Sequence, residues 1–191
     1  MPKVSDEHLE ARREQILEGA RSAFARHGYE GATVTRLEAE IGLSRGAIFD
    51  YFPDKWALFY ELAGRDRHEL TTLMMEPGLD ATIRQLTTES PDWMAVYFEI
   101  LRVLRRDPDR MREFTKRGGE GREEQVEAWL KSLHSSGAFR TDVTLEDIVG
   151  FVNIVANGAA LTRSLEQPLD AEALIKLVHG GIDPQSSSNE L

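Results

Sequence analysis

Three side chains near the start of the chain could read the edges of DNA base pairs. A guanidinium can donate hydrogen bonds to both acceptors that guanine presents in the major groove, and Arg36 and Arg45 could each do so. Phe49 could pack against the methyl group of a thymine. Simpler roles stay open for two of them. Arg36 could be an ordinary surface arginine, and Phe49 could belong to the core, where aromatic residues are often buried.

The neighbours of these residues could hold DNA in place without reading its sequence. Thr35, Ser44 and Tyr51 carry hydroxyls that can bond phosphate oxygens, and the ammonium of Lys55 could reach a phosphate. Gly46 has no side chain, so the backbone could approach DNA closely there. Ser44 also caps the helix that follows it, whatever else it does. The predicted DNA contacts are Thr35, Arg36, Ser44, Arg45, Gly46, Ala47, Phe49, Tyr51 and Lys55.

These candidates lie on two short helices joined by a tight turn. Apolar spacing predicts one helix over 34–40 and a nine-residue helix over 44–52, and Gly42 in the turn ends the first of them. Thr33 or Thr35 could cap the first helix, because either hydroxyl can accept a hydrogen bond from an amide of the first turn. Two helices in this arrangement, braced by a long helix before them, form a helix-turn-helix.

The rest of the chain also predicts helices and shows no convincing alternation typical of a strand. We expect an all-α protein of about nine helices, with a three-helix domain over 1–53 that holds the helix-turn-helix at about 33–52. A larger helical domain over 54–183 follows, and 184–191 form a disordered tail. The glycines in Gly118–Gly121 should interrupt or loosen one helix. The predicted helices cover 5–27, 34–40, 44–52, 55–75, 79–88, 92–106, 109–133, 145–165 and 171–180.

The composition limits what the protein can be. Its formal net charge is -10, and residues 1–60 hold eight Lys and Arg against ten Asp and Glu, so most of the excess acid lies later. DNA binding would therefore depend on where a few cations sit, and non-specific affinity should be weak. The chain has no cysteine, which excludes disulfides and thiolate sites. A polar N-terminus and no apolar run near the length of a bilayer predict a cytoplasmic protein that binds no membrane.

The segment from about Arg12 to Phe59 resembles the DNA-binding domain of the tetracycline-repressor (TetR) family of bacterial regulators. It combines GY in the first loop, T-V before the first short helix, G-x-S-x-G at the turn, Tyr51-Phe52 and Asp54-Lys55. Two later motifs, DWMxxxxEIxxxLRxDP and RTDV, are similar to an actinobacterial branch of aconitase repressors.

The resemblance implies an all-helical homodimer that represses transcription by binding a palindromic operator, so the protein would be associated with the nucleoid. An unknown small-molecule effector in the C-terminal domain would swing the fourth helix and change the separation of the two DNA-binding heads. The resemblance also implies a dimer interface through 145–165 and 171–180. The first of these helices is apolar on more faces than a surface helix needs. A purely intramolecular core is the alternative.

Two residues depart from the family pattern. Glu38 stands where the family often has alanine, and we expect it to face solvent or to cap a helix. Asp50 stands where histidine or tyrosine is common, and its carboxylate would repel phosphate or accept from a cytosine amine. These residues keep a second hypothesis open, a helical small-molecule- or partner-binding protein with a degenerate DNA-reading head.

Polar-tipped residues of the middle helices are the candidates for an effector pocket. Aromatic side chains with one cation would suit an anionic or aromatic small molecule. The alternative is that the Trp and Tyr residues belong to the core and that the arginine faces water. The candidates are Trp93, Tyr97, Arg102, Trp129 and Asn157.

The sequence does not predict an enzyme. It has no glycine-rich phosphate loop after a strand, no nucleophile elbow and no HExxH motif. His134 and His179 have no second ligand at metal spacing, so we expect no metal site and no cofactor other than the effector.

Overall fold

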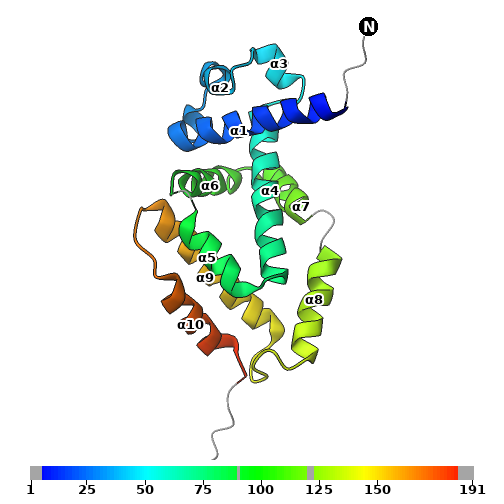
Figure 1. Cartoon of the computed structure of the whole chain (residues 1–191), viewed down its shortest axis with the longest axis vertical. Coiled ribbons are helices and arrows are strands. Elements are labelled where there is room, and N and C mark those ends of the chain that lie inside the picture. Colours follow the sequence, from blue (N-terminus) through cyan, green and yellow to red (C-terminus); the bar gives the residue numbers. More distant parts are fainter. Residues whose placement is uncertain (1–5, 90, 120–122, 185–191) are drawn as a thin grey trace, which may run out of the picture. The chain divides into compact units, whose positions relative to one another are not determined.

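The computed structural model of the chain describes residues 6–89, 91–119 and 123–184. Within these residues it holds ten α-helices and no β-strand, which confirms the predicted all-α class (Figure 1). The helices are α1 (Asp6–Gly31), α2 (Val34–Ile41), α3 (Arg45–Phe49), α4 (Lys55–Met75), α5 (Leu79–Thr88), α6 (Pro91–Leu104), α7 (Pro108–Gly119), α8 (Glu123–Ser135), α9 (Leu145–Ser164) and α10 (Ala171–Ile182).

Most helix boundaries agree with the apolar spacing and with the breaks at glycine and proline, and α5 covers the predicted 79–88. The expected number of helices is one too low, because the single helix predicted over 109–133 is two helices, α7 and α8. The glycine run is at this break, but its last two residues lie outside the described residues. The predicted tail also lies outside them, apart from Pro184.

Gly28 divides α1 where the sequence predicts its end. The φ of Gly28 is 69° and its ψ is 169°, which is not a helical conformation. A residue with a Cβ adopts a positive φ of this kind only with strain, whereas glycine does so readily. The regular helix therefore ends here, and Tyr29–Gly31 forms a separate helical turn.

Local hydrogen bonds begin and end the short helices. Thr33 accepts a hydrogen bond from an amide in the first turn of α2, which decides between the two predicted caps. Gly42 ends α2 in the left-handed conformation. Ser44 caps α3, and Asp54 accepts from an amide in the first turn of α4. These interactions involve residues within four positions of each other, so the sequence pattern can predict them.

The predicted length of the third helix is wrong. It was expected over 44–52, but α3 has five residues. The amide of Tyr51 bonds the carbonyl of Ile48, three positions back instead of four, at 3.1 Å. The chain tightens at this point, and Pro53 prevents the helix from continuing.

The chain forms two compact units, and the boundary between them crosses α4 after His68. The first unit holds the described residues up to His68 together with Pro91–Gly118. The second holds the described residues of 69–90 and those after Gly118. Thus the structure groups α6 with the helix-turn-helix, although the two are far apart in the sequence. The division after residue 53 into a reading domain and an effector domain stays a prediction.

Aromatic rings form the centre of the first unit. Phe59 of α4 is fully buried, and its ring centroid lies 5.9–6.4 Å from those of Phe24, Tyr29, Trp93 and Phe114. These rings come from α1, α4, α6 and α7. Helix α6 packs along α1 (Figure 1). The core of the first unit therefore fixes α6 against α1, the helix on which α2 of the helix-turn-helix packs.

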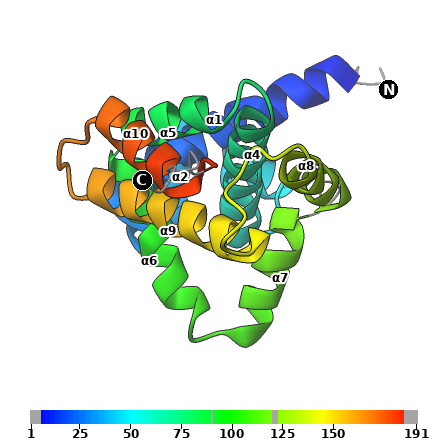
Figure 2. The same ribbon diagram turned by 90° about the horizontal axis from the view of Figure 1, so that it is seen from below.

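The second unit has a smaller core, built where α5, α9 and α10 pack on one another (Figure 2). Phe151 of α9 lies over Gly181 of α10, where a Cβ would be 3.1 Å from the ring. The buried members of this core cluster are Ile83, Ile148, Ile175, Val178 and Ile182.

Large apolar side chains stay exposed on α9 and α10. Ile154 of α9 and Leu177 of α10 are each 72% exposed, and Leu161 of α9 is 46% exposed. Leu165, the residue that follows α9, is 61% exposed. By length and composition alone α9 could cross a membrane, which corrects the expectation that no segment could. A helix with such a face needs an apolar environment, and another protein surface supplies it as well as a lipid does.

Candidate nucleic-acid interface

The helix-turn-helix is held in place by its inner face. Leu37 and Ile41 of α2, Ile48 of α3 and Phe52 after it are at most 4% exposed. Gly19 of α1 lets α2 approach closely, because a Cβ there would lie only 2.7 Å from the Cα of Ile41. With these residues inside, the opposite sides of α2 and α3 must face outward.

That outward side carries most of the predicted DNA contacts. Thr35 and Arg36 of α2 are exposed, and so are Ser44, Arg45 and Gly46 at the start of α3. A Cβ added to Gly46 would meet no atom within 4 Å, so the space in front of this glycine is open. The structure therefore leaves all five residues accessible, as the predicted base and phosphate contacts require.

The two arginines are partly engaged within the protein. Nη1 of Arg36 donates to the carbonyl of Gly31 at 2.8 Å. The guanidinium carbon of Arg45 lies 5.8 Å from the ring centroid of Phe49. A guanidinium has five N–H donors, so both arginines keep donors for an external acceptor.

Ala47, Phe49 and Tyr51 are half-buried. Phe49 and Tyr51 also pack against the core of the first unit. Phe49 could therefore pack on the core with one part of its ring and contact a thymine methyl with the other. Tyr51 likewise combines a core contact with partial exposure.

Lys55 has an intramolecular partner that the sequence did not indicate. Its Nζ donates to the carbonyl of Tyr29 at 2.8 Å and lies 4.3 Å from the centroid of the Tyr29 ring. Partial burial lowers the pKa of Lys55 from its usual value, and the nearby carboxylates of Glu30 and Glu99 oppose this shift. The ammonium that we predict to contact a phosphate is therefore already held in place by Tyr29.

The two departures from the family pattern have different surroundings. Oε1 of Glu38 accepts a hydrogen bond from the amide of Arg45 at 2.6 Å, so Glu38 is a second cap of α3, one of the two roles that we expected. A phosphate at this helix start would have to compete with the carboxylate. Asp50 is exposed just after α3.

The five predicted effector residues are divided between the two units. Trp93 is 2% exposed, and its Nε1 donates to Oδ2 of Asp66. Tyr97 is half-buried against other aromatic rings of the first unit, and Arg102 is exposed. Trp129 and Asn157 belong to the second unit, where Asn157 is exposed. Trp93 therefore belongs to the core and Arg102 faces water, as the alternative interpretation of these residues stated.

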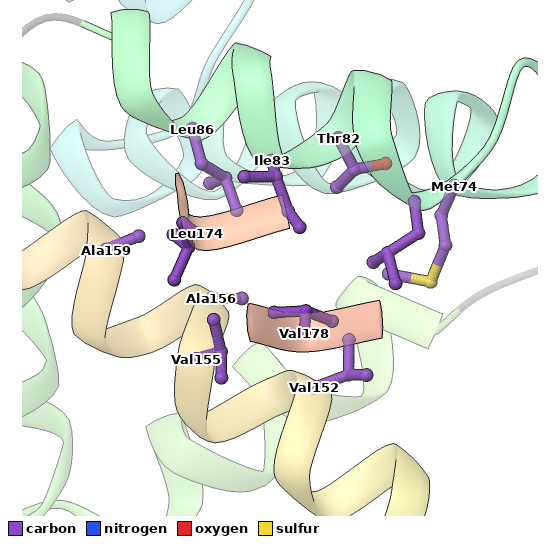
Figure 3. A pocket seen from close by; sticks show the side chains of 11 residues that line it. Met74, Thr82, Ile83, Leu86, Val152, Val155, Ala156, Ala159, Leu174 and Val178 are labelled. Carbon is purple, nitrogen blue, oxygen red and sulfur yellow. The ribbon is translucent and has the colours of Figure 1, made fainter. Parts of the chain in front are cut away.

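The second unit contains a cavity that sequence reasoning missed (Figure 3). The space inside it that a water-sized sphere can occupy is about 20 Å³, and the wider hollow of about 330 Å³ includes open solvent. Thr82 is the one lining residue with a polar side chain, and its hydroxyl donates to the carbonyl of Gly78. Its walls are aliphatic, so no polar-tipped residue in the sequence indicated this site. The lining residues are Met74, Leu79, Thr82, Ile83, Leu86, Val152, Val155, Ala156, Ala159, Leu174 and Val178.

His179, one of the two histidines for which no metal was expected, connects α10 to α5. Nε2 of His179 lies 2.7 Å from Oδ1 of Asp80, and its Nδ1 lies 2.9 Å from Oδ1 of Asp183. These two carboxylates raise the pKa of His179 above its usual value. Among the described residues no cluster of His, Asp and Glu could hold a metal ion.

The fold and this surface define a helix-turn-helix protein. Residues 16–62 match the bacterial regulatory proteins of the tetR family. The HTH-type transcriptional repressor Rv1474c of Mycobacterium tuberculosis is 40% identical over 185 residues, which cover 95% of this chain and 98% of that protein. The HTH-type transcriptional repressor AcnR of Corynebacterium diphtheriae is 42% identical over 183 residues, which cover 89% and 94%.

Solved structures show the same fold. Salmonella enterica GusR superposes with a TM-score of 0.68 at 20% identity, over 94% of this chain and 98% of that one. The regulator FadR from Bacillus subtilis, solved in complex with stearoyl-CoA, superposes with a TM-score of 0.59 at 14% identity, over 89% and 99%. The chain belongs to the tetR family of bacterial regulatory proteins. It is a DNA-binding transcriptional regulator and not an enzyme.

Proposed function

We propose that this protein is a repressor that binds a palindromic operator as a homodimer. The observation that carries this function is the exposed row Thr35, Arg36, Ser44, Arg45 and Gly46 on a helix-turn-helix whose other face is buried. The names of the two relatives, both transcriptional repressors, support repression over activation. Such a protein acts in the cytoplasm, in association with the nucleoid.

Within this row Arg45 is the principal base contact. It stands at the start of α3, where a recognition helix directs its first residues into the major groove. Arg36 is the second base contact, and Phe49 packs on a thymine methyl. Thr35, Ser44, Tyr51 and Lys55 contact phosphates, and Gly46 and Ala47 let the backbone lie close to the DNA.

The dimer forms through α9 and α10. Their exposed apolar residues would each cost free energy in water, about 25 cal/mol per Å² of apolar surface, unless a second surface covers them. A second copy of the chain presents the same face, as an isologous interface requires. Two heads on one dimer then match the two half-sites of a palindrome.

A small-molecule effector controls the repressor. The presence of stearoyl-CoA in the FadR structure supports a small-molecule ligand for this fold. The aliphatic cavity of the second unit is the proposed place for an apolar part of that ligand (Figure 3). The set Trp93, Tyr97, Arg102, Trp129 and Asn157 stays a prediction, which a ligand-bound structure would test.

The test is a selection of bound duplexes from a random DNA pool, with wild type and Arg45→Ala run side by side. Arg106→Ala is the matched control, because it removes an exposed arginine from the first unit outside the helix-turn-helix. We expect a palindrome from wild type and from the control, and none from Arg45→Ala. If wild type enriches no sequence at low salt, the second hypothesis, a ligand- or partner-binding protein with a degenerate head, replaces the repressor.

A further inference from the structure

A carboxylate of α6 binds the backbone of the last turn of α1, the segment after Gly28. Oε2 of Glu99 accepts the amide of Tyr29 at 2.9 Å, and Oε1 accepts the amide of Glu30 at 3.2 Å. Gly28 leaves room for this contact, because a Cβ there would lie 2.9 Å from Oε2. Glu99 is separated from Tyr29 by 70 residues in the sequence, yet both belong to the first unit.

The same segment also holds the ammonium of Lys55. Nζ of Lys55 donates to the carbonyl of Tyr29, which belongs to the same peptide group as the amide of Glu30. One peptide group therefore donates to the carboxylate of Glu99 and accepts from the ammonium of Lys55. Hydrogen bonds to charged groups are stronger than neutral ones, and bonds in a chain polarise and strengthen each other.

This arrangement links α6 to the start of α4. The peptide group cannot rotate without losing a charge-assisted hydrogen bond at each end. Lys55 is half-buried and has three N–H donors, of which one is directed at Tyr29. The remaining donors can bind a phosphate while the ammonium stays where Tyr29 holds it.

We propose that Glu99 is a positioning residue for DNA recognition, which acts by orienting the Tyr29–Glu30 peptide group and, through its carbonyl, the ammonium of Lys55. Glu99 itself touches no DNA. The inference rests on the proposed function, because it takes Lys55 to be a phosphate contact. It adds a residue of α6, outside the helix-turn-helix, to the machinery that binds the operator.

The direction in which DNA affinity changes when Glu99 is substituted distinguishes a positioning role from a simple charge effect. Removing a carboxylate from an acidic protein reduces its repulsion of DNA, so charge alone predicts tighter binding. Loss of positioning predicts weaker binding, because the ammonium must then be ordered when DNA binds. A single substitution at Glu99 therefore distinguishes the two effects.

The experiment measures the affinity of the full-length protein for the selected operator at fixed salt. We expect Glu99→Gln to weaken binding about tenfold, the size of one lost charge-assisted hydrogen bond. Asp92→Asn is the matched control, since it removes the same charge from an exposed position of the same helix. It should leave the affinity unchanged or raise it. Unchanged or tighter binding by Glu99→Gln would overturn the inference.

A double-mutant cycle tests the route through Lys55. In a Lys55→Met background, Glu99→Gln should have little further effect, because the group that it positions is gone. If the losses of affinity from Glu99→Gln and Lys55→Met were fully additive, the inference would be overturned. Glu99→Asp keeps the charge but shortens the reach to the two amides, so it should also weaken binding. It supplies the test if Glu99→Gln does not fold.

Two readouts without DNA separate failure of this inference from failure of the proposed function. In Glu99→Gln the amide of Glu30 should exchange its hydrogen faster, and the pKa of Lys55, followed by NMR titration, should fall. Unchanged exchange and titration would overturn the inference even if wild type binds its operator. A wild type that enriches no operator would instead overturn the repressor function.

Discussion

The two units of this protein bury their apolar residues to different degrees. The first unit encloses the rings of Phe24, Phe59 and Trp93 almost completely. The second unit has a smaller buried cluster and leaves Ile154 and Leu177 of its own helices mostly exposed.

The difference agrees with the partner that we propose for each unit. On the first unit the exposed row at α2 and α3 is polar or has no side chain, which suits hydrated phosphates and base edges. On the second unit the exposed face is aliphatic, which suits another apolar protein surface. Folding of the first unit should therefore depend on its own core, whereas the second unit should gain stability when the dimer forms.

The largest expected effect is loss of the first core. Phe59→Ala should reduce the free energy of unfolding by about 3–5 kcal/mol, because it removes a fully buried ring from among five others. Chemical denaturation measures this loss. Leu177→Ala, at a position that is 72% exposed, is the control and should change the stability of the dissociated chain by less than about 0.5 kcal/mol. Equal losses would contradict the contrast between the units.

The next effect concerns the apolar face of the second unit. Ile154→Asp combined with Leu177→Asp should raise the dimer dissociation constant about 30-fold or more, because buried charges replace central apolar contacts. Sedimentation equilibrium measures this dissociation constant. Gln125→Asp adds one exposed charge to α8 and should have no such effect. A double variant that stays dimeric would place the interface elsewhere.

A smaller and two-sided effect is expected at the DNA surface. Gly46→Ala should raise the free energy of unfolding by about 1 kcal/mol, because alanine favours a helix and its Cβ meets no atom within 4 Å. The same methyl group should weaken operator binding about tenfold, since it occupies the space that DNA approaches. Gly64→Ala, at another helical glycine with open space, should stabilise the protein without affecting DNA binding. If Gly46→Ala binds DNA like wild type, the backbone does not approach the duplex there.

The smallest effect is a pH dependence within the second unit. Asp183 and Asp80 raise the pKa of His179, so the charged imidazole stabilises the folded state. This contribution is fully present below the unfolded pKa of about 6.5 and is lost as the pH rises through the higher folded pKa. His179→Gln should lower the melting temperature at pH 6 and have little effect at pH 9. His134→Gln on α8 is the control. If His179→Gln lowered the melting temperature equally at both pH values, the ion pairs would be excluded as the cause.

Sequence reasoning predicted the helix-turn-helix and most helix ends because these depend on neighbouring residues. Gly42 and Ser44 each act within one turn of the helix that they end or begin. The length of α3 was overestimated, because the tightening at Tyr51 is not visible as a break in the apolar pattern. Aliphatic walls gave no chemical signal for the cavity of the second unit.

The amino-acid sequence by itself determined the class of fold and the breaks between helices, and it supplied the candidates for DNA contact. Only the tertiary structure decided the partners of Lys55, Trp93 and Glu99. These partners lie 26, 27 and 70 positions away along the chain. Periodicity and capping act over a few residues, whereas such pairs form only when packing brings distant helices together. The same physical reason places Glu99 of α6 beside the backbone that leads into the DNA-reading helices.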